Sequence, residues 1–152
     1  MNLELHGGTI IGDLEIEAPP EAVFDALTTP QDLAAWWGAE GVYRTHDWEI
    51  DLRPGGTWNC RATSAGGDMT VEGVYLEVDR PTKLAYTWNP SWETIPPTTV
   101  RYTLSKIASG TRVHFEHSGF DGHLKSQQGH VEGWKRVIEW LAGYLNGKAV
   151  SK

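Results

Sequence analysis

Cysteine is almost missing from this sequence, because Cys60 is the only one in 152 residues. A single cysteine excludes an internal disulfide, and a chain of this length can bury a sizeable core without one. Long apolar runs are missing too, since no stretch approaches the roughly 20 residues that span a bilayer as a helix. The first ten residues, MNLELHGGTI, lack a basic start followed by an apolar run, so we expect no signal peptide. These absences predict a cytoplasmic protein.

Basic residues are also few, with 13 lysines and arginines against 20 acidic residues and a formal net charge of −7. Nucleic-acid binding needs a basic face, so we expect no nucleic-acid partner. The same charge balance argues against docking on an anionic membrane.

No motif of nucleotide binding or nucleophilic catalysis appears, and the segment DLRPGG is a turn without the lysine of a phosphate loop. His114 and Glu116 would lie on one face of a strand and His117 on the other, whereas zinc needs three or four convergent ligands. We therefore expect neither a metal nor a cofactor.

The pattern of apolar residues predicts one domain over residues 1–152, with loose ends at about residues 1–6 and 147–152. A first strand falls within residues 8–20 and ends at two prolines. Short helices follow over residues 20–29 and 30–38. For the second helix, Thr29 is the expected N-cap and Asp32 completes a capping box.

Six further strands are predicted from period-two alternation between turn signals. Trp48, Ile50 and Leu52 share a face of the first, and Gly73 suggests a bulge or bend in the third. The six strands cover residues 46–52, 57–63, 69–79, 83–89, 99–107 and 112–120.

The last element is a predicted helix over residues 124–145, which carries one apolar stripe. The stripe consists of Val131, Trp134, Val137, Ile138, Leu141 and Leu145. The expected fold class is α+β, with a curved antiparallel sheet of about seven strands wrapped around this helix. Two curved surfaces do not touch everywhere, so a pocket is expected between them.

Five segments, in order, resemble the START-like or helix-grip superfamily, also called SRPBCC. Within it, the chain looks like the branch named for the C-terminal domain of the activator of heat-shock-protein-90 ATPase. The segments are IEAPPEAVFDALTTPQDLAAWWG, DLRPGGTWN, EGVYLEVDRPTKLAYTWN, TTVRYTLSKIASGTRVHFEHSGF and GHVEGWKRVIEWLAGYL. The resemblance implies a helix-grip fold, and members of the wider superfamily bind apolar molecules between the sheet and the long helix.

Eight tryptophans are the most conspicuous candidates for a site. Alternation or helical phase points several of them inward, and the resemblance places two more near the mouth of the cavity. Either they pack the core or they line a pocket for a flat apolar ligand. The candidate aromatic ligand-binding residues are Trp36, Trp37, Trp48, Trp58, Tyr86, Trp88, Tyr102 and Trp134.

Two histidines complete the candidate site. His117 continues the inward face of its strand, and the resembling family also has a histidine at this HSG segment. His130 lies four residues before Trp134 on the helical stripe, so the two histidines could converge in one cavity. They either make ordinary interior hydrogen bonds, or orient a ligand's carbonyl or hydroxyl, or act as a general acid and base.

Three functions remain open at this point. The first, which we favour, is the binding of a small hydrophobic molecule. The second is a polyketide cyclase or hydrolase-like enzyme that uses the same cavity. The third is a co-chaperone-like, stress-response interaction module, which an exposed patch around Trp92, Ile95 and Trp140 would favour. The protein is expected to be a monomer or a homodimer.

Overall fold

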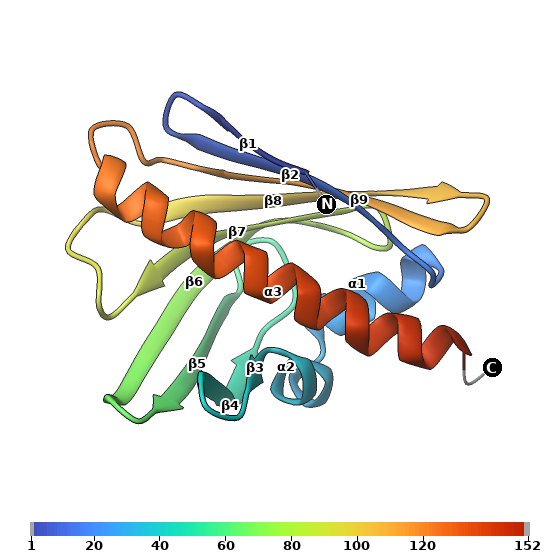
Figure 1. Cartoon of the computed structure of the whole chain (residues 1–152), viewed down its shortest axis with the longest axis horizontal. Helices are drawn as coiled ribbons and strands as arrows, with labels where there is room; N and C mark the ends of the chain where they lie inside the picture. The colour runs from blue at the N-terminus through green and yellow to red at the C-terminus, as the bar shows by residue number, and fades with distance from the viewer. Residues whose placement is uncertain (1, 151–152) are drawn as a thin grey trace.

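A single curved antiparallel sheet and a long C-terminal helix, α3 (Leu124–Val150), make up most of the computed structural model, which describes residues 2–150. The nine strands follow the order β1-β2-β9-β8-β7-β6-β5-β4-β3. Figure 1 shows the sheet curling around α3, with β1, β2 and β9 on one side of the helix and β4 and β5 on the other. The predicted helix-grip fold class is therefore confirmed.

The strands are joined largely by tight turns, so neighbours in sequence are mostly neighbours in the sheet. The exception is the pairing of β2 with β9, which adds the N-terminal hairpin of β1 and β2 to the last strand of the sheet in sequence. Their bounds are β1 (Asn2–His6), β2 (Thr9–Ile16), β3 (Gly38–Ala39), β4 (Tyr43–Ile50), β5 (Thr57–Ser64), β6 (Gly67–Asp79), β7 (Lys83–Pro90), β8 (Thr98–Ile107) and β9 (Gly110–Ser118).

Two predictions were wrong. The sheet has nine strands rather than about seven, and residues 2–6 form a strand rather than a loose start. Asn2–His6 forms β1, which pairs with β2 from Asn2 opposite Asp13 to His6 opposite Thr9. Gly7 makes the turn possible, since its φ of 58° is a conformation that glycine adopts without strain. The second addition, β3, is only two residues long and pairs with the start of β4.

The expectation of a loose end over residues 147–152 was also wrong in part. The backbone of α3 continues to Val150, past the predicted end at residue 145. Residues 151–152, the remainder of that prediction, lie outside the described residues.

Two short helices, α1 (Pro20–Thr28) and α2 (Pro30–Trp36), follow β2 as predicted. The predicted capping box is not formed, because the Thr29 side chain makes no cap hydrogen bond. The Asp32 carboxylate instead accepts a hydrogen bond from the Tyr144 hydroxyl at 2.5 Å. Asp32 thus ties α2 to α3 rather than closing its own helix.

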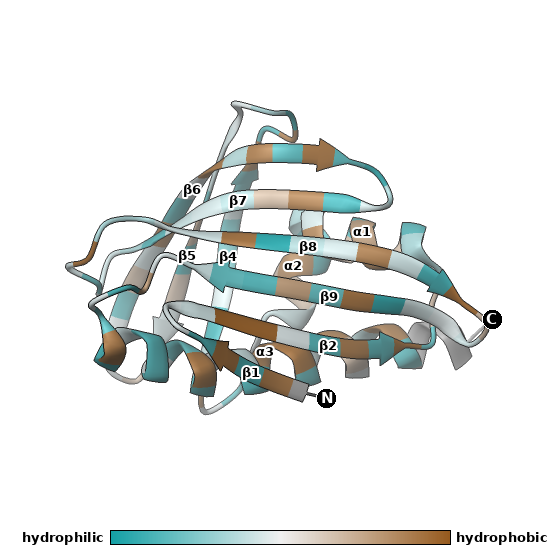
Figure 2. Ribbon diagram, turned by 90° about the horizontal axis from the view of Figure 1, so that it is seen from above, coloured by the Kyte–Doolittle hydropathy of each residue, from teal (hydrophilic) through white to brown (hydrophobic). Residues whose placement is uncertain are grey.

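Alternation along the strands places the core on the concave side of the sheet. Figure 2 shows hydrophobic and hydrophilic residues alternating along the strands, with the three helices on one side of the sheet. The apolar stripe of α3 packs onto this face, where the rings of Phe115 and Trp134 stack at 4.3 Å between centroids. Burial of such large aromatic pairs anchors α3 to the sheet.

Two strands depart from regular alternation. In β4 the register with β5 shifts between His46 and Glu49, next to Asp47 with a φ of 54°, and Leu52 lies beyond the strand with 40% of its surface exposed. The prediction that Leu52 shares a strand face with Trp48 and Ile50 was therefore wrong. The bulge predicted at Gly73 was also misplaced, because the register of β6 with β7 shifts between Tyr75 and Glu77.

Candidate functional site

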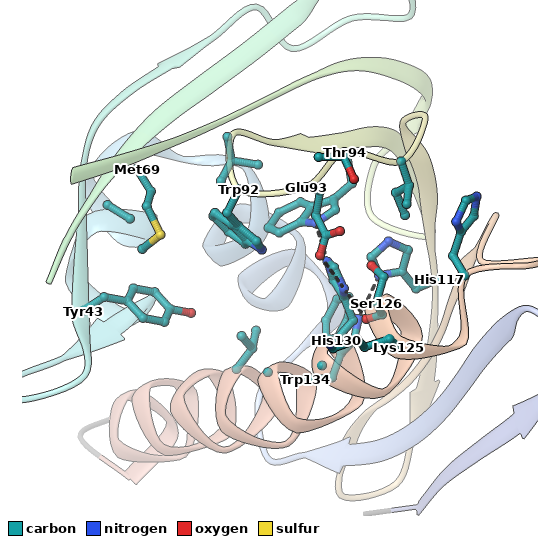
Figure 3. A pocket seen from close by; sticks show the side chains of 18 of the residues that line it. Tyr43, Met69, Trp92, Glu93, Thr94, His117, Lys125, Ser126, His130 and Trp134 are labelled. Atoms are coloured by element: carbon teal, nitrogen blue, oxygen red, sulfur yellow. Dashed lines mark hydrogen bonds and ion pairs between the residues drawn. The ribbon is translucent and has the colours of Figure 1, made fainter. Parts of the chain in front are cut away.

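A cavity of about 940 Å³ lies between the concave face of the sheet, the loop of residues 91–97 and α3. Its mouth lies beside that loop, where Trp92 is 47% exposed, and beside the exposed start of α3 at Leu124. Figure 3 shows Tyr43 and Met69 at one end of the cavity, and His117, Lys125 and Ser126 at the other. The aromatic side chains that line it are Trp37, Tyr43, Trp48, Trp88, Trp92 and Trp134.

The indole rings form a wall because they pack against one another in stacked and tilted pairs. Trp37 follows the end of α2, and its ring stacks on Trp88 from β7 at 5.9 Å with an interplanar angle of 14°. Trp37 also lies 5.8 Å from Trp48 of β4. Alternation turns both strand tryptophans inward, so three separate elements supply one continuous aromatic surface.

Four of the candidate residues lie behind this wall and do not line the cavity. Trp36 stacks on Trp37 at 5.1 Å and donates its indole N–H to the Ala26 carbonyl. Trp58 stacks behind Trp48 at 5.9 Å. The remaining two, Tyr86 and Tyr102, are buried with their hydroxyl oxygens 3.1 Å apart, and burial raises the pKa of both. These four support the wall from within the core.

His117 lies on β9 with 1% of its surface exposed. Its Nδ1 accepts a hydrogen bond from the Trp134 indole N–H at 3.0 Å, so the ring proton belongs on Nε2, which lies 2.6 Å from the Thr98 hydroxyl oxygen. Burial, and secondarily the neighbouring His130, hold the pKa of His117 well below its usual value. The imidazole is therefore neutral at physiological pH.

His130 converges with His117 as predicted, with ring centroids 5.3 Å apart. Its Nε2 accepts the Trp88 indole N–H at 3.1 Å, and its Nδ1 donates to the Ser126 carbonyl at 2.9 Å. Both nitrogens of both histidines are thus engaged with protein groups. In this arrangement the two rings position Trp88 and Trp134, and neither offers a free lone pair to a substrate.

The sequence interpretation missed several residues that line the cavity. Tyr43 accepts the Trp37 indole N–H at 3.1 Å, which leaves its hydroxyl proton free to point elsewhere. The Cys60 thiol lines the interior, and burial raises its pKa to about 12, so it is a small apolar wall group rather than a nucleophile.

Glu93 is the most informative of the missed residues. Figure 3 shows it reaching from the loop toward His130, with Oε1 4.0 Å from Nδ1. The sequence signal was an acidic residue next to Trp92 in a loop that closes a hairpin.

No group of three histidine, cysteine, aspartate or glutamate side chains in the described part of the chain is arranged to hold a metal ion. No helix over the described residues is both long and apolar enough to cross a membrane.

A curved antiparallel sheet wrapped around a long C-terminal helix is the architecture of the START-like class of α+β proteins. A family model described as Activator of Hsp90 ATPase homolog 1-like protein matches residues 17–146. The chain belongs to this family, which confirms the resemblance seen in the sequence. No curated protein matches the chain.

Solved structures agree with this assignment. A protein from Nitrosomonas europaea is 26% identical with a TM-score of 0.79, over 93% of this chain and 96% of that one. A protein from Rhodobacter sphaeroides superposes with a TM-score of 0.83 at 17% identity, over 99% and 98% of the two chains. A protein from Aeromonas hydrophila, named after the same family, is 22% identical with a TM-score of 0.77, over 92% and 93%. The last two show the fold alone.

Proposed function

We propose that the protein binds a small apolar or aromatic molecule in the cavity between the sheet and α3. The observation that carries this proposal is the volume of about 940 Å³ that remains open beside six aromatic side chains. Pockets for small organic ligands measure roughly 300–1,000 Å³ and are lined mainly by hydrophobic and aromatic groups. Stacked indoles can receive a flat ring without rearrangement, because their faces already lie along one surface.

Two observations make the other functions less suitable. An enzyme of the cyclase or hydrolase type needs polar groups within hydrogen-bond reach of one substrate atom. The ring nitrogens of His117 and His130 are instead hydrogen-bonded to other protein groups. An interaction module would present a broad apolar patch, but Trp140 packs its ring against Tyr43 at 5.5 Å, which leaves Trp92 as the exposed member. The monomer or homodimer state stays a prediction.

Pyrenylbutanol is a suitable neutral probe, because its vibronic emission bands report transfer from water into an apolar site. Gly133 lines the cavity, and a Cβ atom there meets nothing within 4 Å, so Gly133→Phe adds a ring to the cavity lining at a position with space for the Cβ atom. Gly143→Phe is the matched control, since Gly143 lies on the same helix in open space. We expect Gly133→Phe to weaken binding about tenfold or more, a loss of about 1.4 kcal/mol, and Gly143→Phe to leave it unchanged.

The proposal fails if pyrenylbutanol leaves its emission unchanged with the unmodified protein up to the solubility limit of the probe. It fails equally if both phenylalanine variants bind like the unmodified protein, because the probe would then sit outside the cavity. Circular dichroism on each variant verifies that the helix and sheet content are retained.

A further inference from the structure

Glu93 places a carboxylate in a cavity that is lined mainly by aromatic and other apolar side chains. Its side chain is only 17% exposed. Among the described residues, no side chain or backbone N–H donates a hydrogen bond to it, and the nearest ion-pair contact is His130 Nδ1 at 4.0 Å. Burying a charge without a partner is unfavourable, so a largely buried carboxylate of this kind calls for a cation or a hydrogen-bond donor.

His130 does not supply the missing positive charge. Its Nε2 accepts a hydrogen bond from the Trp88 indole, which can only donate, so that nitrogen carries no proton. The proton on Nδ1 is directed to the Ser126 carbonyl at 2.9 Å, a shorter contact than the 4.0 Å to Glu93. The histidine is therefore neutral, and the Glu93 charge stays uncompensated on the cavity side.

Lys125 and His117 do not compensate the negative charge of Glu93 either. Lys125 lies at the mouth but is exposed on the first turn of α3, where water screens its charge. His117 is buried and neutral. The whole chain carries a formal charge of −7, which raises the local concentration of cations and steers them to a negatively charged cleft.

We propose that the ligand of this cavity is an organic cation, with an apolar or aromatic body on the indole wall and an ammonium-type nitrogen against Glu93. This inference rests on the proposed function and names the chemical class of the ligand. Trp88 and Trp92 line the cavity close to Glu93 along the chain, and indole faces attract organic cations. An ammonium group would thus meet a carboxylate and aromatic faces in one place, while its body fills the hollow.

The test compares three pyrene probes that differ only in the head group: pyrenylbutylamine, pyrenylbutanol and pyrenylbutanoate. With the unmodified protein, we expect the amine to bind about tenfold more tightly than the alcohol, since a hydrogen bond between charged groups is stronger than one to a neutral group. The butanoate should bind most weakly, because its carboxylate would approach that of Glu93.

Glu93→Gln keeps the shape of the side chain and removes its charge. This variant should weaken the amine about tenfold, leave the alcohol within about twofold and strengthen the butanoate. Glu139→Gln is the matched control: Glu139 is exposed on α3 and outside the cavity, and its loss changes the net charge by the same single unit. It should leave all three affinities within about twofold.

The two levels of inference fail in different ways. If the alcohol binds but the amine has no advantage, or if the butanoate binds best, the cation proposal is overturned and the proposed function stands. An equal loss of amine affinity in Glu93→Gln and Glu139→Gln would also overturn it, since general attraction would then explain the preference. If none of the three probes binds, both inferences are overturned.

Discussion

His117 is a single residue on which several interior contacts depend. It accepts the Trp134 N–H and faces the Thr98 hydroxyl, so it links α3, β8 and β9 within one side chain's reach. With 1% of its surface exposed, it has no access to replacement hydrogen bonds from water. Its role in the structure is to accept a hydrogen bond from the indole N–H of Trp134, which is buried on the apolar stripe of α3.

Replacing His117 with leucine should therefore destabilise the fold. The change keeps an apolar side chain of similar size but strands the Trp134 N–H, and an unsatisfied buried donor costs about 1–3 kcal/mol. We expect the free energy of unfolding in urea to fall by about 2 kcal/mol. His6→Leu on exposed β1 is the control and should change it by less than about 0.5 kcal/mol. A similarly small loss for His117→Leu would refute the role assigned to this hydrogen bond.

At the scale of elements, β6 passes so close to β5 and β7 that residue 73 has no room for a side chain. Trp58 on β5 lies over Gly73, which is its register partner on β6. A Cβ atom at residue 73 would lie 1.9 Å from the Thr87 carbonyl oxygen and 2.5 Å from Trp58 Nε1. Gly73 is therefore needed for close packing between strands rather than for a bulge.

Gly73→Ala should consequently lower the free energy of unfolding by about 1–3 kcal/mol, the usual cost of forcing atoms into a packed interior. Gly66→Ala serves as the control, because its nearest neighbour would be the Ser64 hydroxyl at an ordinary 3.7 Å. Thermal melts followed by circular dichroism measure both. Equal melting temperatures for the two variants would contradict the close approach of Trp58 and Gly73.

Periodicity predicted most elements, because burial on one face leaves a local signal. It could not predict β1, whose evidence is pairing with β2 at a sheet edge rather than a buried face. Alternation also assigns a side of the sheet but not a depth, so Trp58 and Trp48 looked alike although only Trp48 lines the cavity. Glu93 was missed because the path of a proline-rich loop depends on distant packing.

At the scale of the whole molecule, buried and surface histidines respond to acid in opposite directions. The folded chain keeps the pKa of His117 below that of the unfolded chain. For His114, partial burial lowers the pKa, but hydrogen bonds to Glu116 and Asp13 outweigh it and raise the pKa overall. The first histidine therefore opposes folding in acid and the second favours it.

Stability should fall as the pH drops below about 6.5, because the unfolded chain then takes up a proton that folded His117 refuses. Above that pH, the titration of His117 does not change the free energy of unfolding. Below it, His117 lowers this free energy by at most about 1.4 kcal/mol per pH unit. His114 stabilises the fold below pH 6.5, and this stabilisation is lost as the pH rises through the pKa of folded His114. Urea unfolding between pH 5 and 7.5 measures the sum.

Two variants separate these contributions. His117→Leu should flatten the decline in acid, and His114→Leu should steepen it. A profile that is the same in His117→Leu and the unmodified protein would show that other groups control the acid response.

The tryptophans around the hollow also have an optical consequence. Trp36, Trp37 and Trp88 follow one another at 5.1 and 5.9 Å, and Trp48 continues the series to Trp58 at 5.9 Å. Chromophores this close share their excited state, so ultraviolet light absorbed by one ring migrates to its neighbours. A molecule that contacts one of these indoles would therefore change the fluorescence of the whole group of tryptophans.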